Sequence, residues 1–279
     1  MQKRSLEQSC YVAGAGAFGV FFRWLQNMLA FDEAGLNEKS VFNVLVPLLI
    51  VAAALMFRRY YDRLHRQKYY VSEDFCEALF NPGRLFAAAR WIAGLMMVAG
   101  AGILVITTET DPDAELIRIL ALLAAMSGIA FPLVLGSANY DEFANVPLVR
   151  LGMLLPVIMY SFWLVLSYKQ NAYNSVVWSY AMEMFVIIVA ALAFFRVSGF
   201  AFFVVNERKC LFLVMLAGAM CIMVLADERY MGMQIIFLAS AMMLLLYNWI
   251  LLMNMKKKDR RSEEEMNSPR YGDGFEQIR

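Results

Sequence analysis

The chain has 279 residues, of which 61% are hydrophobic and 18% are charged, and its mean hydropathy is +0.55. Soluble domains contain about 45–50% apolar and about 25% charged residues, so this composition excludes an ordinary soluble enzyme and a disordered chain. The 25 Lys and Arg residues balance 24 Asp and Glu residues, which excludes a general nucleic-acid binder with its basic surface. The composition therefore predicts an integral membrane protein.

Hydropathy predicts eight membrane-crossing helices, since one crossing needs about 20 mostly apolar residues. Helices are expected because lipid leaves every backbone donor and acceptor to be satisfied within the segment. In chain order, the predicted spans are residues 10–31, 41–57, 85–108, 114–136, 146–168, 175–195, 210–226 and 231–253. The connections are short, so we predict that residues 1–255 form one all-α, polytopic bundle.

The distribution of cations predicts the orientation of this bundle, because cytoplasmic loops carry an excess of Lys and Arg. With both termini in the cytoplasm, the outer loops hold Lys39, Lys169 and Arg229, three cations lie inside spans, and the other 19 of the 25 lie on the inner side. We therefore expect a multi-pass protein of the cell membrane, plasma or inner, with both termini cytoplasmic. The least typical inner loop is 137–145, which contains acids and no cation.

The longest inner connection combines a basic run with an amphipathic segment. We expect residues 58–68 to lie at anionic lipid headgroups, where each cation contributes about 1 kcal/mol, although topology alone also places cations there. Residues 73–80 carry apolar side chains on one face and acids on the other, which predicts a short amphipathic helix with Ser72 as its N-cap. That helix could instead bind a cytoplasmic partner protein. We predict that the polar tail, residues 256–279, is disordered.

The sixth apolar stretch is longer than one crossing needs, since it continues from residue 195 to Val205. Two arrangements fit this pattern. The sixth helix is long and kinked near Ser198-Gly199, or residues 197–205 lie along the inner interface.

The sequence favours no cofactor, metal or catalytic centre. The string Gly14-Ala15-Gly16-Ala17-Phe18-Gly19 matches GxGxxG, but a dinucleotide site needs a preceding strand and a helix N-terminus. Inside an apolar helix, these small residues predict close packing against a neighbouring helix. The single histidine, His65, excludes a multi-histidine zinc site, and neither a phosphate-binding loop nor a nucleophile elbow occurs in the sequence.

Charged residues within the predicted spans are the strongest functional signal, since each costs at least about 2.5 kcal/mol in a membrane helix. Arg23, Gln26 and Asn27 lie at i, i+3 and i+4 and so form one polar stripe on the first helix. Glu183 lies in the outer half of the sixth span. We predict an outer-half cluster of these four residues, with Arg118 as a further candidate member. It is either a packing ion pair or the wall of a cavity for a small anionic or amphipathic ligand.

Three functions remain open. The leading hypothesis is a small-solute transporter, permease subunit or ligand-binding membrane component that uses the predicted cluster. The alternative is a non-catalytic membrane anchor or assembly subunit of a larger complex, favoured by the small outer loops and the charged tail. The third is a membrane enzyme acting on lipid or isoprenoid phosphate, which would need Asp141, Glu142 and Arg150 to form one inner cleft.

Overall fold

The computed structural model describes residues 2–32, 35–36, 41–140, 147–172 and 177–257, and nearly all of them are helical. Eight helices in these ranges have 17 or more residues: α1 (Gln2–Ala30), α2 (Phe42–Arg66), α4 (Arg84–Thr107), α5 (Ala114–Ser137), α7 (Pro147–Asn171), α8 (Val177–Ser198), α9 (Glu207–Met223) and α10 (Met231–Met253). The short elements are α3 (Phe75–Ala78), the 3-10 helix η1 (Val224–Ala226) and four two-residue strands. These strands pair as β1 (Phe31–Asp32) with β2 (Gly35–Leu36) and β3 (Tyr69–Tyr70) with β4 (Lys256–Lys257).

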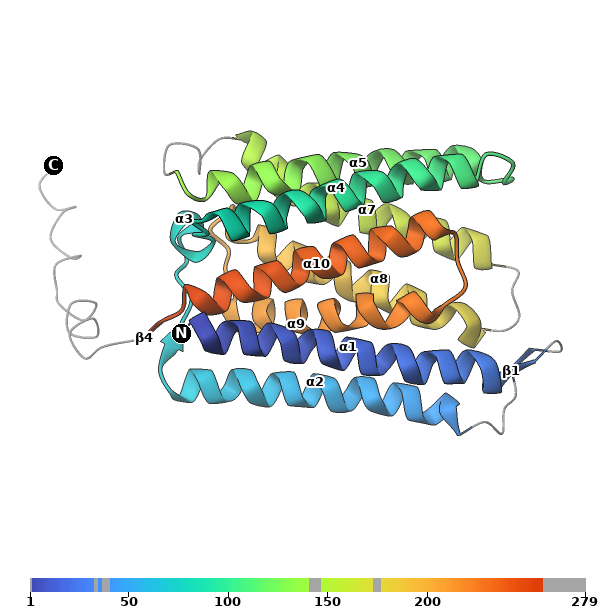
Figure 1. Ribbon diagram of the computed structural model, residues 1–279, viewed down its shortest axis with the longest axis horizontal. Helices are drawn as coiled ribbons and strands as arrows, with labels where there is room; N and C mark the ends of the chain where they lie inside the picture. Colours follow the sequence, from blue (N-terminus) through green and yellow to red (C-terminus); the bar gives the residue numbers. More distant parts are fainter. Residues whose placement is uncertain (1, 33–34, 37–40, 141–146, 173–176, 258–279) are drawn as a thin grey trace, which may run out of the picture.

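The long helices run along one common direction, so the bundle has two ends (Figure 1). We call the end that holds β3, β4 and the start of α1 the basic end, because the cations of residues 58–68, 208–209 and 256–257 lie there. The opposite end, with the β1–β2 pair, is the hairpin end. The start of α1 and the end of α10 lie together at the basic end, as expected for an even number of long antiparallel helices (Figure 1).

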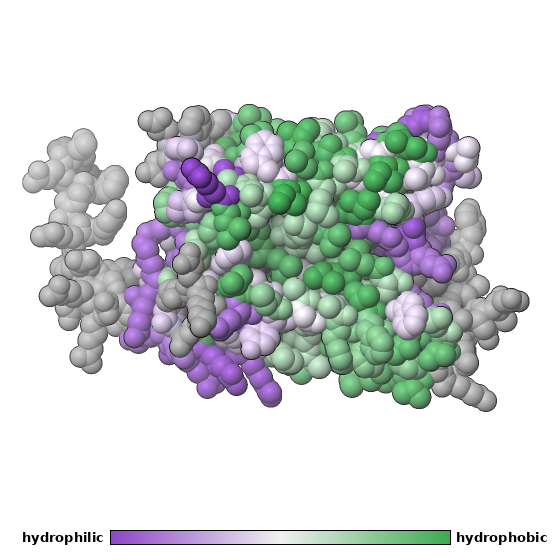
Figure 2. All heavy atoms as spheres, in the orientation of Figure 1, coloured by the Kyte–Doolittle hydropathy of each residue, from purple (hydrophilic) through white to green (hydrophobic). Residues whose placement is uncertain are grey.

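Among the described residues, seven helical segments are long and apolar enough to cross a membrane: α2, α4, α5, α7, residues 180–198 of α8, α9 with η1, and α10. Figure 2 shows apolar residues around the middle of the molecule and hydrophilic residues at both ends. The chain is thus an all-α, multi-pass membrane protein. Helix α1 is not in this set, because its glycines and its residues Arg23, Gln26 and Asn27 lower its hydropathy. It nevertheless packs lengthwise against α2, α9 and α10 (Figure 1).

The centre of the bundle is formed by α9 and α10, most of whose residues are buried, whereas α2 lies at the rim. Glycines bring α1 close to α9. A Cβ placed on Gly16 would lie 2.8 Å from the carbonyl oxygen of Ala219, and one on Gly19 would lie 2.8 Å from Met223 Cγ. The GxGxxG string therefore lies within a packed helix, as its apolar context indicated.

One connection differs from the sequence prediction, and at a second the structure contradicts one of the two arrangements left open. Helix α3 has four residues, and its N-cap is Asp74, whose side chain accepts a hydrogen bond from the Glu77 amide at 3.0 Å. The bundle itself covers the apolar side of this segment, since Phe75 and Leu79 are buried. Helix α8 ends at Ser198, so the long-helix alternative is wrong: the chain turns there, and the Val204 amide donates to Gly199 O at 3.0 Å. The predicted disordered tail lies almost wholly outside the described residues.

Candidate functional site

The turn between α9 and α10, residues 227–230, is set back from the hairpin end of the bundle. The apolar stretch 210–226 that precedes it has 17 residues, which span about 26 Å at 1.5 Å per residue. A bilayer hydrocarbon core is about 30 Å thick, so this stretch ends before the level that the other helices reach. In Figure 1 the turn accordingly lies short of the ends of α1, α4 and α5. Its charged side chains are thereby placed among the helices.

One arm of the recessed turn pairs with the polar stripe on α1. Arg23 is 1% exposed, and its Nε donates to Asp227 Oδ1 at 2.6 Å. Arg23 Nη1 donates to Gln26 Oε1 at 2.7 Å, and Asn27 Nδ2 donates to Asp227 Oδ1 at 3.1 Å. Gln26 in turn donates to Asn43 Oδ1 of α2 at 3.2 Å. The three stripe residues therefore face protein, which removes most of the cost of placing a guanidinium at this depth.

The other arm of the turn pairs with α8. Arg229 Nη2 donates to Asp227 Oδ2 at 3.1 Å, and Arg229 also forms an ion pair with Glu183. Gln234 Nε2 donates to the backbone oxygen of Asp227 at 3.0 Å. The result is a chain of alternating charges, Arg23–Asp227–Arg229–Glu183, which we call the ionic chain. Its two cations balance its two anions, as a buried set of charges requires.

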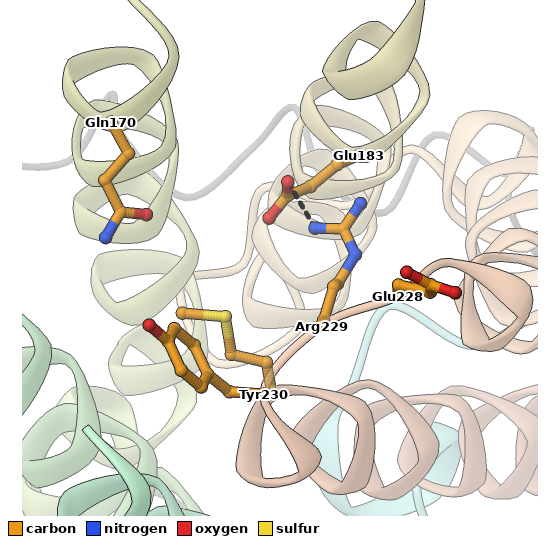
Figure 3. A pocket seen from close by; sticks show the side chains of 6 residues that line it. Gln170, Glu183, Glu228, Arg229 and Tyr230 are labelled. Carbon is orange, nitrogen blue, oxygen red and sulfur yellow. Dashed lines mark ion pairs between the residues drawn. The ribbon is translucent and has the colours of Figure 1, made fainter. Parts of the chain in front are cut away.

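A pocket of about 470 Å³ lies above the recessed turn. Figure 3 shows Gln170 of α7 facing the Glu183–Arg229 pair across this pocket, with Tyr230 near its lower edge. The full lining is Gln170, Glu183, Glu228, Arg229, Tyr230 and Met233. A volume of this size accommodates a small organic molecule. The ionic chain thus ends in a wall of a solvent-reachable pocket.

Two polar groups beside the pocket have no partner among the described residues, but only one of them is accessible. Glu228 is exposed and has no ion-pair partner among the residues that the structure describes. Arg229 Nε is buried and has no hydrogen-bond partner within the same part of the chain. Because Arg229 Nε is buried, the pocket offers a ligand one free carboxylate, that of Glu228, and the amide of Gln170. Within the described ranges, no group of three His, Cys, Asp or Glu residues could hold a metal ion.

At the hairpin end, two acids of the α4–α5 loop contact the α9–α10 turn and the end of α7. The Tyr230 hydroxyl donates to Asp111 Oδ2 at 2.6 Å, and Lys169 Nζ lies 2.5 Å from Asp113 Oδ1. The hydrogen bond to Asp111 raises the pKa of Tyr230 above its ordinary value of 10.0, and burial adds to this effect. Tyr230 therefore remains protonated, as the donor of this hydrogen bond, throughout the physiological pH range.

The structure brings together four of the five residues that the sequence singled out. Arg23, Gln26 and Asn27 meet at Asp227, and Glu183 joins them through Arg229 rather than by direct contact with Arg23. Arg118 does not join them: its Nη1 lies 3.1 Å from Glu115 Oε1 on the same helix, and its side chain is 46% exposed. Arg118 therefore belongs to a surface ion pair with Glu115 and not to the predicted cluster. Whether the cluster binds a ligand stays a prediction.

Sequence reasoning missed Asp227 and Arg229, which link the two halves of the ionic chain. Both lie in a four-residue connection that reads as an exposed outer loop. The available signal was the short 17-residue stretch before them, since a helix too short for the membrane places its following turn below the surface.

No family model, no curated protein and no solved structure matches the chain.

Proposed function

We propose that the chain crosses the cell membrane eight times, with both termini in the cytoplasm, and binds a small polar solute at the hairpin-end pocket. In this proposal it acts as a transporter, a permease subunit or a ligand-binding membrane component. The observation that carries the proposal is the pocket itself, because the Glu183–Arg229 pair in its wall continues inward as a buried ionic chain.

The eighth crossing in this proposal is α1. Its packing along α9 and α10 and the pairing of Arg23 with Asp227 support its placement in the bilayer. The concentration of cations at the basic end supports a cytoplasmic location for that end. Cys10 is the exposed cysteine near the basic end, whereas Cys76, Cys210 and Cys221 are buried. A membrane-impermeant maleimide should therefore label Cys10 only from the cytoplasmic side, and Glu109→Cys at the hairpin end only from outside.

Labelling of both sites from the same side would contradict the eight-crossing topology. The Glu109→Cys variant should be made with Cys10→Ser, so that each reaction reports one position.

The pocket favours a solute that carries a positive charge and an acceptor oxygen. Glu228 would pair with the cation, and the Gln170 amide would donate to the oxygen. Arg229 already serves Asp227 and Glu183, so it cannot neutralise Glu228 as well. The pocket therefore selects against a simple anion, so this proposal departs from the anionic or amphipathic ligand expected from the sequence.

Thermal stabilisation of the purified chain tests this proposal. Small amines, zwitterionic amino acids and carboxylic acids should be compared as additives, and we expect members of the first two classes to raise the melting temperature. Glu228→Gln should weaken that stabilisation, because it removes the free carboxylate. Glu109→Gln is the matched control, since Glu109 is an exposed acid of the same end outside the pocket lining. No stabilisation by any class, or equal stabilisation in both variants, would contradict solute binding.

A non-catalytic anchor or assembly role is the second candidate. The mutual neutralisation of Arg23, Asp227, Arg229 and Glu183 favours it, because such a chain fixes helix packing without any ligand. This candidate expects no stabilising solute and a partner protein that survives gentle extraction. The lipid-phosphate enzyme remains a proposal without support, since Asp141 and Glu142 lie outside the described residues.

A further inference from the structure

A second cavity, of about 730 Å³, opens between α1, α2 and α9. We call it the lateral groove. Its lining is mainly apolar: Gly14, Ala15, Phe18 and Gly19 of α1 face Leu49, Ile50, Ala53 and Met56 of α2, with Ala219, Met220 and Met223 of α9 at the base. Helix α2 is the most exposed candidate span, and it packs against α1 and α9 at the edge of the bundle (Figure 1). The groove can therefore be reached sideways from the bilayer.

The groove is empty beside Gly14, where a larger side chain on α1 would have filled it. A Cβ built on Gly14 would meet nothing within 4 Å, whereas one on Gly16 would lie 2.8 Å from the Ala219 carbonyl oxygen. Gly16 is thus needed for helix contact, but the packing of this chain does not require a glycine at position 14. Its missing side chain leaves room for an occupant.

Cations and polar groups mark only the basic end of the groove. Arg59 and Arg63 lie one turn apart on one face of α2, and both line the groove together with Gln8 and Tyr60. Neither guanidinium has an ion-pair partner in the part of the chain that the structure describes. An occupant that matches this pattern has an anionic head and an apolar chain.

The length of the groove matches the thickness of the hydrocarbon region of one leaflet. Ten residues separate Leu49, at its deep end, from Arg59, which corresponds to about 15 Å at 1.5 Å per residue. Half of a hydrocarbon core of about 30 Å is also about 15 Å. With Arg59 and Arg63 at headgroup level, an acyl chain of the same leaflet would reach the bottom of the groove.

We propose that the lateral groove binds one anionic phospholipid of the leaflet at the basic end, with its phosphate at Arg59 and Arg63 and an acyl chain beside Gly14. This site is separate from the hairpin-end pocket and does not depend on solute binding there. The acyl chain replaces the packing that α1 and α2 lack. The phosphate pairs with two cations that have no ion-pair partner among the described residues.

The rate of Cys10 alkylation provides a direct measurement. Cys10 is exposed and lines the groove, whereas Cys76, Cys210 and Cys221 are buried. The full chain in detergent micelles would be titrated with phosphatidylglycerol or phosphatidylcholine, and reaction with a maleimide followed by mass spectrometry. We expect phosphatidylglycerol to slow the reaction at lower concentration than phosphatidylcholine does, and inorganic phosphate to leave it unchanged.

Two pairs of variants separate this site from general membrane electrostatics. Arg59→Gln with Arg63→Gln should weaken protection by phosphatidylglycerol about twenty-five-fold, if each cation contributes about fivefold. Arg58→Gln with Arg66→Gln is the matched control, because it removes two exposed cations of the same helix that lie outside the groove lining.

Gly14→Leu should abolish protection by filling the groove. Gly102→Leu is its control, because a Cβ on exposed Gly102 also meets nothing within 4 Å.

Equal losses in the two arginine pairs would overturn the proposal, because protection would then follow net charge rather than the groove. Unchanged protection in Gly14→Leu would also overturn it. Native mass spectrometry gives an independent count: one phosphatidylglycerol retained by the unaltered chain and lost in Gly14→Leu supports the site, and equal retention contradicts it.

Discussion

Arg23 Nε and Asp227 Oδ1 lie 2.6 Å apart although 204 residues separate them in the chain. Their contact joins the first long helix to the turn that begins the last one. Asp227 also accepts from Arg229, which pairs with Glu183, so α8 is held by the same turn. The recessed turn between α9 and α10 therefore binds both α1 and α8.

Breaking this contact should destabilise the bundle strongly. Arg23→Gln removes one of the two buried cations that pair with Asp227. Loss of one partner of a buried ion pair typically lowers the free energy of unfolding by about 3–5 kcal/mol. We expect a clear fall in the melting temperature of the purified chain. Arg118→Gln removes an exposed pair and should cost less than about 1 kcal/mol.

The corresponding double variant distinguishes coupling from general damage. Arg23→Gln with Asp227→Asn should be more stable than the sum of the two single effects predicts, because neither buried charge is left without its partner. Strict additivity of the two losses would contradict a direct energetic link between these residues.

Asn81 should be a second stabilising residue, at the basic end. It is 1% exposed, and its Nδ2 donates to Leu79 O at 2.6 Å and to Leu135 O at 2.7 Å. Its Oδ1 accepts from Arg90 Nη1 at 2.8 Å. Asn81→Leu should lower the free energy of unfolding by about 2 kcal/mol or more, because several buried polar groups lose their partner.

The comparison for this variant is Asn139→Ala. It removes the half-buried side chain whose Oδ1 accepts a hydrogen bond from the backbone N–H of Asn81 at 2.9 Å. Its effect should be smaller, since fewer buried groups lose a partner. A melting temperature of Asn81→Leu equal to that of the unaltered chain would show that this network does not hold α3 in place.

Hydropathy was sufficient to predict the seven candidate spans in the described part of the chain, because exposing polar backbone in lipid is costly. The crossing assigned to α1 stays a prediction. The polar stripe was also predictable, since i, i+3 and i+4 spacing puts Arg23, Gln26 and Asn27 on one face whatever the tertiary structure. Their partner was not. Asp227 lies in a short charged connection, and only the depth of the preceding helix makes such a connection part of the interior.

The failed assignments have local causes. Arg118 was grouped with the cluster by its depth alone, but Glu115 one turn earlier is a nearer partner. The apolar stretch after residue 195 allowed a longer α8 as one of two arrangements, but the chain turns at Gly199, and Phe200 and Ala201 are buried by the bundle. Composition cannot distinguish apolar residues that continue a helix from apolar residues that pack beneath its end.

The glycines of α1 give a prediction about packing. Gly16→Ala should destabilise the bundle by about 1–3 kcal/mol, because the added methyl group would press on the Ala219 backbone and force α1 away from α9. Gly14→Ala is the matched control two residues earlier and should leave the melting temperature unchanged or raise it. The hypothesis that Gly16 sets the helix distance fails if both variants behave alike.

Tyr230 gives a prediction about pH. Its hydroxyl donates to Asp111, and this hydrogen bond raises the pKa of Tyr230 above 10.0, because deprotonation would lose the bond and place two negative charges together. The stabilising contact is therefore fully present below pH 10 and is lost as the pH rises through the raised pKa.

The alkaline phenolate absorbance of the chain minus that of Tyr230→Phe isolates this one titration. Asp111→Asn should shift its midpoint down towards 10.0, while Glu109→Gln, which changes an uninvolved acid in the same loop, should not. A midpoint that is the same with and without the Asp111 carboxylate would show that the loop does not hold Tyr230 at the pocket rim.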